Sequence, residues 1–323
     1  MEAIAQAQPN IALIKYWGKR NTKLNLPAVQ SLSITLDALW TRTQVTFDES
    51  IPEDRLAING RVEITQLQRV SNVLDRCRRR AGVTLRAKVT SKSNFPVGAG
   101  FASSSSGFAA LAAATIKALE IELSPRELSA IARRASGSAA RSVFGGFVEM
   151  PFDADDDVAR PLLDAASWPL RVVIAVTTDQ PKSVGSTAGM QRTARTSDYY
   201  PAWLDAAERD FSVARQAVVA HDFSTLAEVS ERNCLKMHGV MMSSSPGLIY
   251  WNGASVECMH TIRRLRDSDV PVFFTVDAGP QVKAVCTPEH LAVVRDALRS
   301  VPGVSRVYES CLGPGVRIVE SLE

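Results

Sequence analysis

The stretch NFPVGAGFASSSSG, residues 94–107, stands directly before the apolar run FAALAAATIKAL, residues 108–119. Glycine adopts unusual dihedrals and serine oxygens cap helical amides, so one interpretation is a loop followed by an N-cap. A single serine would suffice for that. Because glycine loops expose backbone amides and a helix N-terminus carries a positive dipole end, the other interpretation is an anion site. Neither nucleotide fingerprint, GxxxxGK[ST] or GxGxxG, occurs here, so a phosphate loop would be of another kind.

The segments around this loop mix strand and helix patterns. Residues 32–36 and 41–47 alternate as strands do, and Asn59-Gly60 predicts a tight hairpin. Residues 85–93 form a predicted strand that leads into the loop. The run from about Ser106 to Leu119 is apolar nearly all round and predicts a deeply buried helix.

Helices and strands continue along the rest of the chain. A helix is predicted over residues 66–81, and Ser124 with Glu127 forms a capping box at the start of another. Residues 171–178 predict a buried strand, whereas the small polar residues of 180–197 predict a loop at a domain junction or a cleft wall. Further helices are expected at 202–222, 222–238, 254–268 and 290–300, and strands at 270–279 and 304–315.

Length and element order predict the architecture. At 323 residues the chain exceeds the usual size of one domain, so two domains that share a cleft are expected. The composition shifts near residue 180, which places the division between 1–180 and 181–323. Helices beside antiparallel sheets in both parts predict the α+β class.

Composition excludes several classes of protein. The chain has 46% hydrophobic and 22% charged residues and no apolar run of the roughly 20 residues that a bilayer requires, so no membrane partner is expected. The N-terminus has no basic stretch before an apolar core, so no signal peptide is expected. We therefore expect a cytoplasmic enzyme. The five cysteines lack a CxxC pair, which argues for reduced thiols.

Charge gives little support to nucleic-acid binding. The net charge is only +3, although RCRRR at residues 76–80 is a local basic cluster. The cluster lies on the predicted helix 66–81, which favours a solvated helix face. A partly covered anion site stays open as the alternative for this cluster. The alternative for the whole protein is nucleic-acid binding, which would be strongly salt-sensitive.

Four segments combine charged or hydroxyl side chains with small residues. They are NIALIKYWGKR (10–20), NFPVGAGFASSSSG (94–107), ASGSAARSVFGGF (135–147) and FTVDAGP (274–280). Taken singly, most of their lysines and arginines would be surface cations. Asp277 differs, because a carboxylate at the end of an apolar strand requires a partner or a role.

Together these segments resemble the GHMP family of small-molecule kinases and, within it, the diphosphomevalonate decarboxylases. ALIKYWGKRNTKLNLP, ASGSAARSVFGGFVE, GSTAGM, NCLKMH and FTVDAGP occur in the same order as in that family and span nearly the whole chain. The resemblance implies a ribosomal-S5-like N-terminal domain that binds ATP, a ferredoxin-like C-terminal domain and an active site between them. It also implies the cofactors ATP and Mg²⁺, mevalonate 5-diphosphate as the substrate, and possible homodimers.

The resemblance implies a reaction and three catalytic residues. ATP-dependent decarboxylation would convert mevalonate 5-diphosphate to isopentenyl diphosphate after phosphorylation of the C3 hydroxyl, a step of isoprenoid biosynthesis in the mevalonate pathway. Asp277 would orient or deprotonate that hydroxyl. Lys15 would stabilise charge near Asp277 and the transferring phosphoryl group, and Arg141 would hold the C1 carboxylate through its bidentate fork.

The resemblance also implies binding residues. The substrate would contact Tyr16, Lys19, Ser136, Ser138, Arg141 and Ser186. ATP would contact Asn94, Gly98, Gly100, Ser103, Ser104, Ser105 and Ser106, with Ser104 as the residue expected on the metal.

The chain departs from the family pattern at three places. It has Pro-Val-Gly-Ala-Gly-Phe at residues 96–101 where the family loop reads Pro-Thr-Ala-Ala-Gly-Leu, and Thr187 stands where some members have arginine. The segment MHGVMMSSSPGLIYW, residues 237–251, also differs from the family's usual run, which has adjacent prolines. These changes bear on nucleotide affinity and on the choice between 5-phosphate and 5-diphosphate. The alternatives are therefore a mevalonate 5-phosphate decarboxylase and a mevalonate-type kinase that releases no carbon dioxide.

Overall fold

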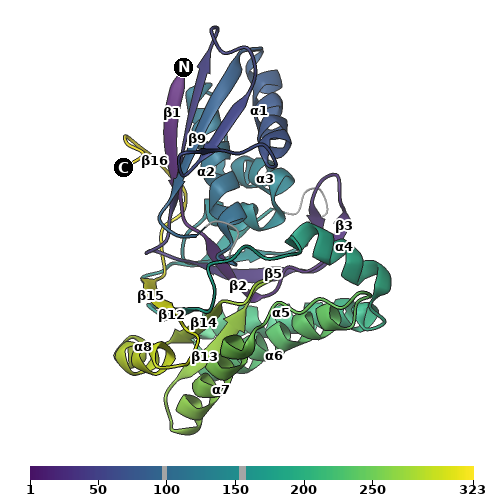
Figure 1. Ribbon diagram of the computed structural model, residues 1–323, viewed down its shortest axis with the longest axis vertical. Helices are drawn as coiled ribbons and strands as arrows, with labels where there is room; N and C mark the ends of the chain where they lie inside the picture. The colour runs from purple at the N-terminus through teal and green to yellow at the C-terminus, as the bar shows by residue number, and fades with distance from the viewer. Residues whose placement is uncertain (97–99, 153–157) are drawn as a thin grey trace.

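Three larger β-sheets, a two-stranded sheet of β3 (Lys19–Asn21) and β4 (Leu26–Pro27), and their covering helices make up the described part of the protein (Figure 1). A computed structural model describes residues 1–96, 100–152 and 158–323. Each half of the chain contains both helices and strands among its described residues, so the predicted α+β class is confirmed. No described helix has both the length and the hydropathy needed to cross a bilayer. All five cysteines are free thiols, as predicted.

The first sheet belongs to the N-terminal half. Its strand order is β16 (Arg317–Val319), β1 (Glu2–Ala7), β6 (Thr41–Asp48), β9 (Arg86–Ser93), β7 (Arg55–Ile58) and β8 (Arg61–Val62). Helices α1 (Leu67–Ala81), α2 (Ser103–Ala118) and α3 (Pro125–Ala135) share one hydrophobic core with this sheet. The hairpin predicted at Asn59-Gly60 joins β7 to β8, and both residues have positive φ.

Helix α2 is the buried helix expected after the serine run, but it begins earlier than predicted. Ser103 is its first residue, so all four serines lie in its first turn, whereas Ser106 was the expected start. The hydroxyls of Ser105 and Ser106 bond the carbonyls of Ala102 and Ser103, which lets these polar residues enter the helix. The capping box of Ser124 at the start of α3 is present, as predicted.

Two further sheets lie side by side below the first. One has the order β11 (Arg160–Leu163), β10 (Phe147–Met150), β5 (Ser31–Thr35), β2 (Asn10–Ile14), and the other β13 (Val272–Val276), β14 (Val282–Cys286), β12 (Arg171–Val176), β15 (Arg306–Cys311). Their facing apolar residues pack together with α5 (Tyr200–Ala220) and α6 (Phe223–Met242) in one core. Helices α7 (Gly253–Asp267) and α8 (Leu291–Arg299) cover the other face of the β12–β15 sheet (Figure 1).

The segment 180–197 is a helix over most of its length, so the predicted loop is wrong there. Helix α4 (Ser186–Thr196) buries Gly189, Met190 and Thr193 on one face. Gly189 permits close packing, because a Cβ at this position would lie 3.0 Å from the indole ring of Trp17. Small residues that read as loop-forming in the sequence therefore serve a close helix contact.

Pairing across the chain bears on the predicted division at residue 180. Strand β12 pairs with β14 and β15, while β16 returns near the C-terminus to pair with β1. The division into 1–180 and 181–323 stays a prediction.

Candidate active site

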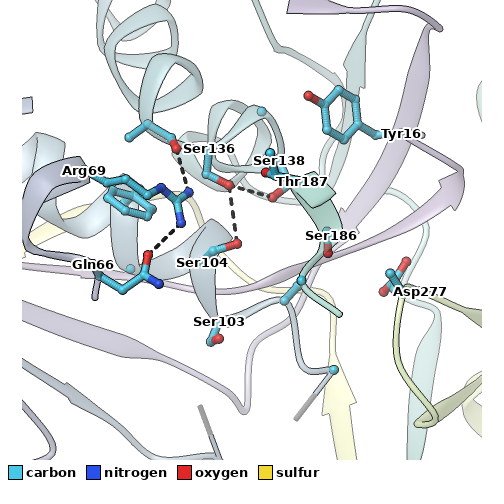
Figure 2. A pocket seen from close by; sticks show the side chains of 18 of the residues that line it. Tyr16, Gln66, Arg69, Ser103, Ser104, Ser136, Ser138, Ser186, Thr187 and Asp277 are labelled. Carbon is cyan, nitrogen blue, oxygen red and sulfur yellow. Dashed lines mark hydrogen bonds between the residues drawn. The ribbon is translucent and has the colours of Figure 1, made fainter. Parts of the chain in front are cut away.

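A cavity of about 970 Å³ lies where the three sheets meet, between the start of α2, the start of α4 and the turn after β13 (Figure 2). Its volume is at the upper end for small-molecule sites and exceeds what one small ligand needs. Its lining contains five cationic side chains and two carboxylates. The predicted site residues in the lining are Lys15, Tyr16, Lys19, Gly100, Ser103, Ser104, Ser136, Ser138, Arg141, Ser186 and Asp277.

Three residues predicted to bind ATP are not part of this lining. Asn94 is exposed, and its amide bonds the backbone of Trp40 and Ala38. Ser105 and Ser106 are fully buried within the fold. Gly98 lies outside the described residues. The structure therefore gathers the first two serines of the run at the cavity and turns the last two inward.

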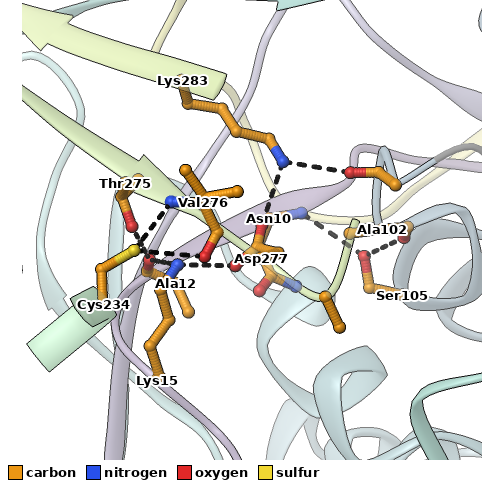
Figure 3. A network of polar contacts seen from close by, with 12 residues as sticks. Asn10, Ala12, Lys15, Ala102, Ser105, Cys234, Thr275, Val276, Asp277 and Lys283 are labelled. Carbon is orange, nitrogen blue, oxygen red and sulfur yellow. Dashed lines mark hydrogen bonds and ion pairs between the residues drawn. The ribbon is translucent and has the colours of Figure 1, made fainter. Parts of the chain in front are cut away.

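The buried Lys15 and the partly exposed Asp277 form an ion pair in the lining of the cavity (Figure 3). Strand β2 ends at Ile14 and β13 ends at Val276, so both side chains are delivered from the ends of well-anchored strands. Lys15 Nζ donates to Asp277 Oδ1 at 2.8 Å and to the Ala12 carbonyl at 2.8 Å. Although burial alone would raise it, the pKa of Asp277 is held well below its usual range by its lysine neighbours.

Lys283 is a second buried lysine beside Asp277, and the sequence analysis missed it. Its Nζ lies 3.5 Å from Asp277 Oδ2, and the side chain is 1% exposed. The signal was present in the sequence: a lysine within VKAVC, an otherwise apolar strand, has to find a partner or carry a large cost.

Arg141 is fully buried on the 3₁₀ helix η1 (Gly137–Val143) and faces the cavity. Its guanidinium donates to the hydroxyls of Ser31 at 2.7 Å and Ser33 at 3.0 Å, and to Asn10 Oδ1 at 3.3 Å. Burial lowers its pKa to about 10, so it stays charged at neutral pH. Among the described residues no carboxylate pairs with it, so its charge is available to an anionic ligand.

Hydroxyl groups and one tyrosine surround the next part of the cavity. Ser136 Oγ lies 3.4 Å from Ser104 Oγ and 3.3 Å from Ser138 Oγ (Figure 2). The ring of Tyr16 packs on Gly137, where a Cβ would lie 2.2 Å from the tyrosine oxygen. Only glycine fits there, which explains its place between the two serines.

Lys19 lies at the rim of the same region. Its ammonium donates to Asn25 Oδ1 at 2.7 Å and to Thr187 Oγ1 at 3.2 Å. Burial lowers its pKa to about 8, so the group remains mostly charged at neutral pH. Thr187, the position where the chain departs from the family pattern, therefore supplies an acceptor rather than a second cation.

The first turn of α2 points into the cavity. Ser103 and Ser104 line it, and the turn begins after Ala102, which has a φ of 55°. Free amides of a first helical turn and the positive end of the helix dipole attract phosphate groups. This geometry favours the anion-site interpretation of the serine run over a simple cap.

Two further cations in the lining were not predicted from the sequence. Lys182, just before α4, donates to Ser186 Oγ at 2.7 Å and to the Ala278 carbonyl at 2.9 Å. Burial lowers its pKa to about 8. Arg69 of α1 donates to Gln66 and to the Ala135 carbonyl. Both lie in segments that read as an ordinary loop and an ordinary helix, so no local signal distinguished them.

The far part of the cavity has an apolar wall. It consists of Leu56, Ile58, Val70, Val89, Phe108 and Leu111 from β7, α1, β9 and α2. A flat heteroaromatic group could pack there, with its charged end toward the α2 N-terminus.

The basic cluster at residues 76–80 has divided roles. Arg78 is buried and pairs with Asp54 and with Asp75, the latter at 2.8 Å. Arg76 and Arg79 line a separate hollow of about 400 Å³. The prediction of a solvated face is wrong for Arg78, because its helix position turns it toward the first sheet.

The protein combines mixed helices and sheets with a serine-bearing helix N-terminus beside a buried lysine and an aspartate. This combination is typical of the GHMP-type small-molecule kinase fold. Comparison with known proteins narrows this class. Residues 7–160 match the family described as diphosphomevalonate decarboxylase-like N-terminal domain, and residues 172–312 the mevalonate 5-diphosphate decarboxylase C-terminal domain. The chain belongs to the diphosphomevalonate decarboxylase family.

Individual relatives agree over nearly the full length. The diphosphomevalonate decarboxylase of Candida albicans is 34% identical, with 97% of this chain and 96% of the relative covered. A structure of the mevalonate diphosphate decarboxylase from Enterococcus faecalis superimposes with a TM-score of 0.91 at 38% identity, over 99% of both chains. Another, described as MDDEF in complex with MVAPP, AMPPCP and magnesium, has a TM-score of 0.92 at 39% identity, also over 99% of both.

Proposed function

We propose that this chain catalyses the ATP-dependent decarboxylation of mevalonate 5-diphosphate to isopentenyl diphosphate, with release of ADP, phosphate and carbon dioxide. The observation that carries the proposal is the position of the Lys15–Asp277 pair, in the same cavity as the serines of α2 and the guanidinium of Arg141, which pairs with no carboxylate in the part of the chain that the structure describes. A phosphoryl donor, a tertiary alcohol and a carboxylate can each meet a matching group there. Family membership supports the same activity.

Two ligands are proposed to occupy different parts of the cavity. The apolar wall formed by β7, α1, β9 and α2 suits the base of ATP, and the α2 N-terminus with Ser103 and Ser104 suits its phosphates. The diphosphate of the substrate would lie near Tyr16, Lys19 and the paired serines of η1. The lining has five cations but only two carboxylates, and this excess of positive charge favours the binding of two polyanions at the same time.

Mg²⁺ fits the donor set at the start of α2. Magnesium prefers oxygen ligands and takes only one or two from a protein when it binds a nucleotide. Ser103 and Ser104 at the start of α2, and Asp277 elsewhere in the same lining, have such oxygens. When bound, the ion neutralises charge on the transferring phosphoryl group.

The first step is transfer of the γ-phosphoryl group to the C3 hydroxyl. Asp277 accepts the hydroxyl proton and orients the oxygen toward phosphorus. Since the pKa of Asp277 is low, this carboxylate is a weak base, and orientation is its main contribution until the new P–O bond has largely formed. Lys15 fixes the carboxylate through Oδ1 and contributes positive charge nearby.

The second step breaks two bonds. As the C3–O bond to phosphate breaks, the electron pair of the C1–C2 bond forms the C2=C3 double bond, and C1 leaves as carbon dioxide. Arg141 orients the C1 carboxylate before this step through charge-assisted bonds. Its guanidinium is itself held by Ser31 and Ser33, so it keeps a fixed position while the negative charge of the carboxylate is lost.

A substrate panel tests the proposal. Purified protein is given ATP with mevalonate, with its 5-phosphate or with its 5-diphosphate, and ADP and carbon dioxide are measured together. Equal release of both from the 5-diphosphate alone supports the proposal. ADP without carbon dioxide identifies a kinase, and preference for the 5-phosphate identifies the alternative decarboxylase. Homodimer formation and a cytoplasmic location stay predictions, to be tested by sedimentation and by cell fractionation.

A further inference from the structure

Lys283 is an unusual residue for its position. It is the second residue of β14, every residue of which is buried, and it pairs in register with Thr275 of β13. Its side chain shares a sheet face with Val285, and Val285 pairs with Phe273 in an apolar core. A buried ammonium is costly unless its charge and its protons are matched. Its partners should therefore explain why the position carries a charge.

The ammonium of Lys283 has two partners that come from different parts of the chain (Figure 3). It donates to the carbonyl of Gly100 at 3.0 Å, and it lies 3.5 Å from Oδ2 of Asp277. Gly100 belongs to the segment that leads into α2 and lines the cavity. One cation thus joins the start of the proposed phosphate site to the proposed catalytic carboxylate.

The backbones on either side of this bridge are in direct contact. A Cβ added to Gly279 would lie 2.8 Å from the Cα of Gly100, and one added to Gly100 would lie 3.3 Å from the Cα of Gly279. Gly100 also has a φ of 92°, which side-chain-bearing residues rarely adopt. The turn after Asp277 and the segment before α2 therefore form one tight junction, and Lys283 contacts a residue on each side of it.

The two lysines approach different oxygens of the carboxylate. Lys15 bonds Oδ1 at 2.8 Å, whereas Lys283 lies 3.5 Å from Oδ2, an atom that has no hydrogen-bond partner among the described residues. Both lower the pKa of Asp277. The other ionisable groups that interact with Asp277 are Arg141, Lys182, Cys234 and His238.

We propose that Lys283 is a positioning residue for phosphoryl transfer. It fixes the second oxygen of Asp277 and ties it to Gly100, so the carboxylate keeps its orientation relative to the phosphates bound at the α2 N-terminus. This proposal rests on the proposed function, because it assigns Asp277 and the α2 N-terminus their roles.

The test uses Lys283→Met in the full-length protein, which keeps the unbranched side chain and removes the charge. ADP and carbon dioxide formation should fall together, on the order of 10²-fold in kcat, as expected when a reacting group is misplaced. The acid limb of the profile of kcat/KM against pH should move to higher pH, because the carboxylate has lost one of two cations. KM for the 5-diphosphate substrate should stay unchanged.

The matched control is Arg78→Met, which also removes a buried cation from an ion pair, with Asp54, but outside the cavity lining. Both variants are assayed below their melting temperatures. If Lys283→Met only melts earlier, as the control does, with kcat and the acid limb unchanged, the proposal is wrong. If Lys283→Met does not fold, the same measurements are made on Lys283→Gln, which keeps a hydrogen-bond donor but has no charge, and the same outcomes decide. Lys283→Arg, which keeps the charge, should recover part of the activity.

Failure of this proposal is distinguishable from failure of the proposed function. An unchanged Lys283→Met variant beside an active wild type and an inactive Asp277→Asn variant would remove only the role of Lys283. A wild-type protein that forms no carbon dioxide from any of the three substrates would instead overturn the function, and the role of Lys283 with it.

Discussion

Lys15 and Asp277, separated by 262 residues in the chain, meet in a 2.8 Å ion pair at the junction of the β2 and β13 strand ends. The pair ties the end of β2 to the end of β13 in the lining of the cavity. Asn233 of α6 supports it by accepting a bond from the Lys15 backbone amide at 2.8 Å. Folding and the proposed chemistry therefore depend on the same contact.

Arg141→Lys should reduce carbon dioxide release on the order of 10²-fold while ATP binding persists, because an ammonium cannot reproduce the fixed planar fork held by Ser31 and Ser33. Turnover and nucleotide affinity measured on the same preparation check this expectation. Near-normal release of carbon dioxide would remove Arg141 from the carboxylate site.

The four serines of the α2 first turn should respond differently to alanine. Ser103→Ala and Ser104→Ala should raise KM for ATP, because these two side chains line the cavity. Ser105→Ala and Ser106→Ala should instead lower the free energy of unfolding by about 1 kcal/mol each, since their buried hydroxyls bond backbone carbonyls. Chemical denaturation and steady-state kinetics separate the two effects, and an identical response of all four would contradict this division.

Affinity for ATP should depend on pH through Lys182. Burial lowers its pKa from an ordinary value of 10.5 to about 8, so the ammonium is present below pH 8 and is lost as the pH rises through it. If this ammonium contacts phosphate, KM for ATP should increase between pH 7 and pH 9, and Lys182→Arg should flatten that increase. A wild-type KM that does not change across this range would argue against phosphate contact.

The same pKa shift has a consequence for stability. Between about pH 8 and 10.5 the folded protein holds the neutral amine of Lys182 while the unfolded chain keeps the proton. The unfolded state then binds more protons, so this group makes the free energy of unfolding rise with pH in that window. Urea denaturation of the wild type and of Lys182→Met at pH 7.5 and 9.5 should show a smaller rise for the variant.

Local patterns predicted much of the fold. Alternation predicted β5 and β6, the Asn59-Gly60 pair predicted the β7–β8 hairpin, and the capping box predicted the start of α3. Helix α4 was missed because glycine and threonine at its buried face are poor helix formers, and only contact with Trp17 explains them. Packing between distant segments decided that case.

The candidate site shows the same limit. Segment resemblance predicted Lys15, Arg141 and Asp277, and the structure brings all three to one cavity. Ser105 resembles Ser104 in every local respect, and only the phase of the helix turns one inward and the other toward the cavity. The apolar strand around Lys283 signals a buried charge, but its partners, Gly100 and Asp277, lie on separate segments and follow only from the folded structure.

The central claim is that Asp277 acts in phosphoryl transfer, before carbon dioxide is lost. The most direct measurement is the initial rate of ADP and of carbon dioxide formation from ATP and mevalonate 5-diphosphate by Asp277→Asn, beside the wild type. Asparagine keeps the size of the side chain but removes the charge and the proton acceptor. We expect both rates to fall together by a factor on the order of 10²–10⁴ while the substrate still binds. ADP formed at the normal rate without carbon dioxide would place Asp277 after phosphoryl transfer and contradict the claim.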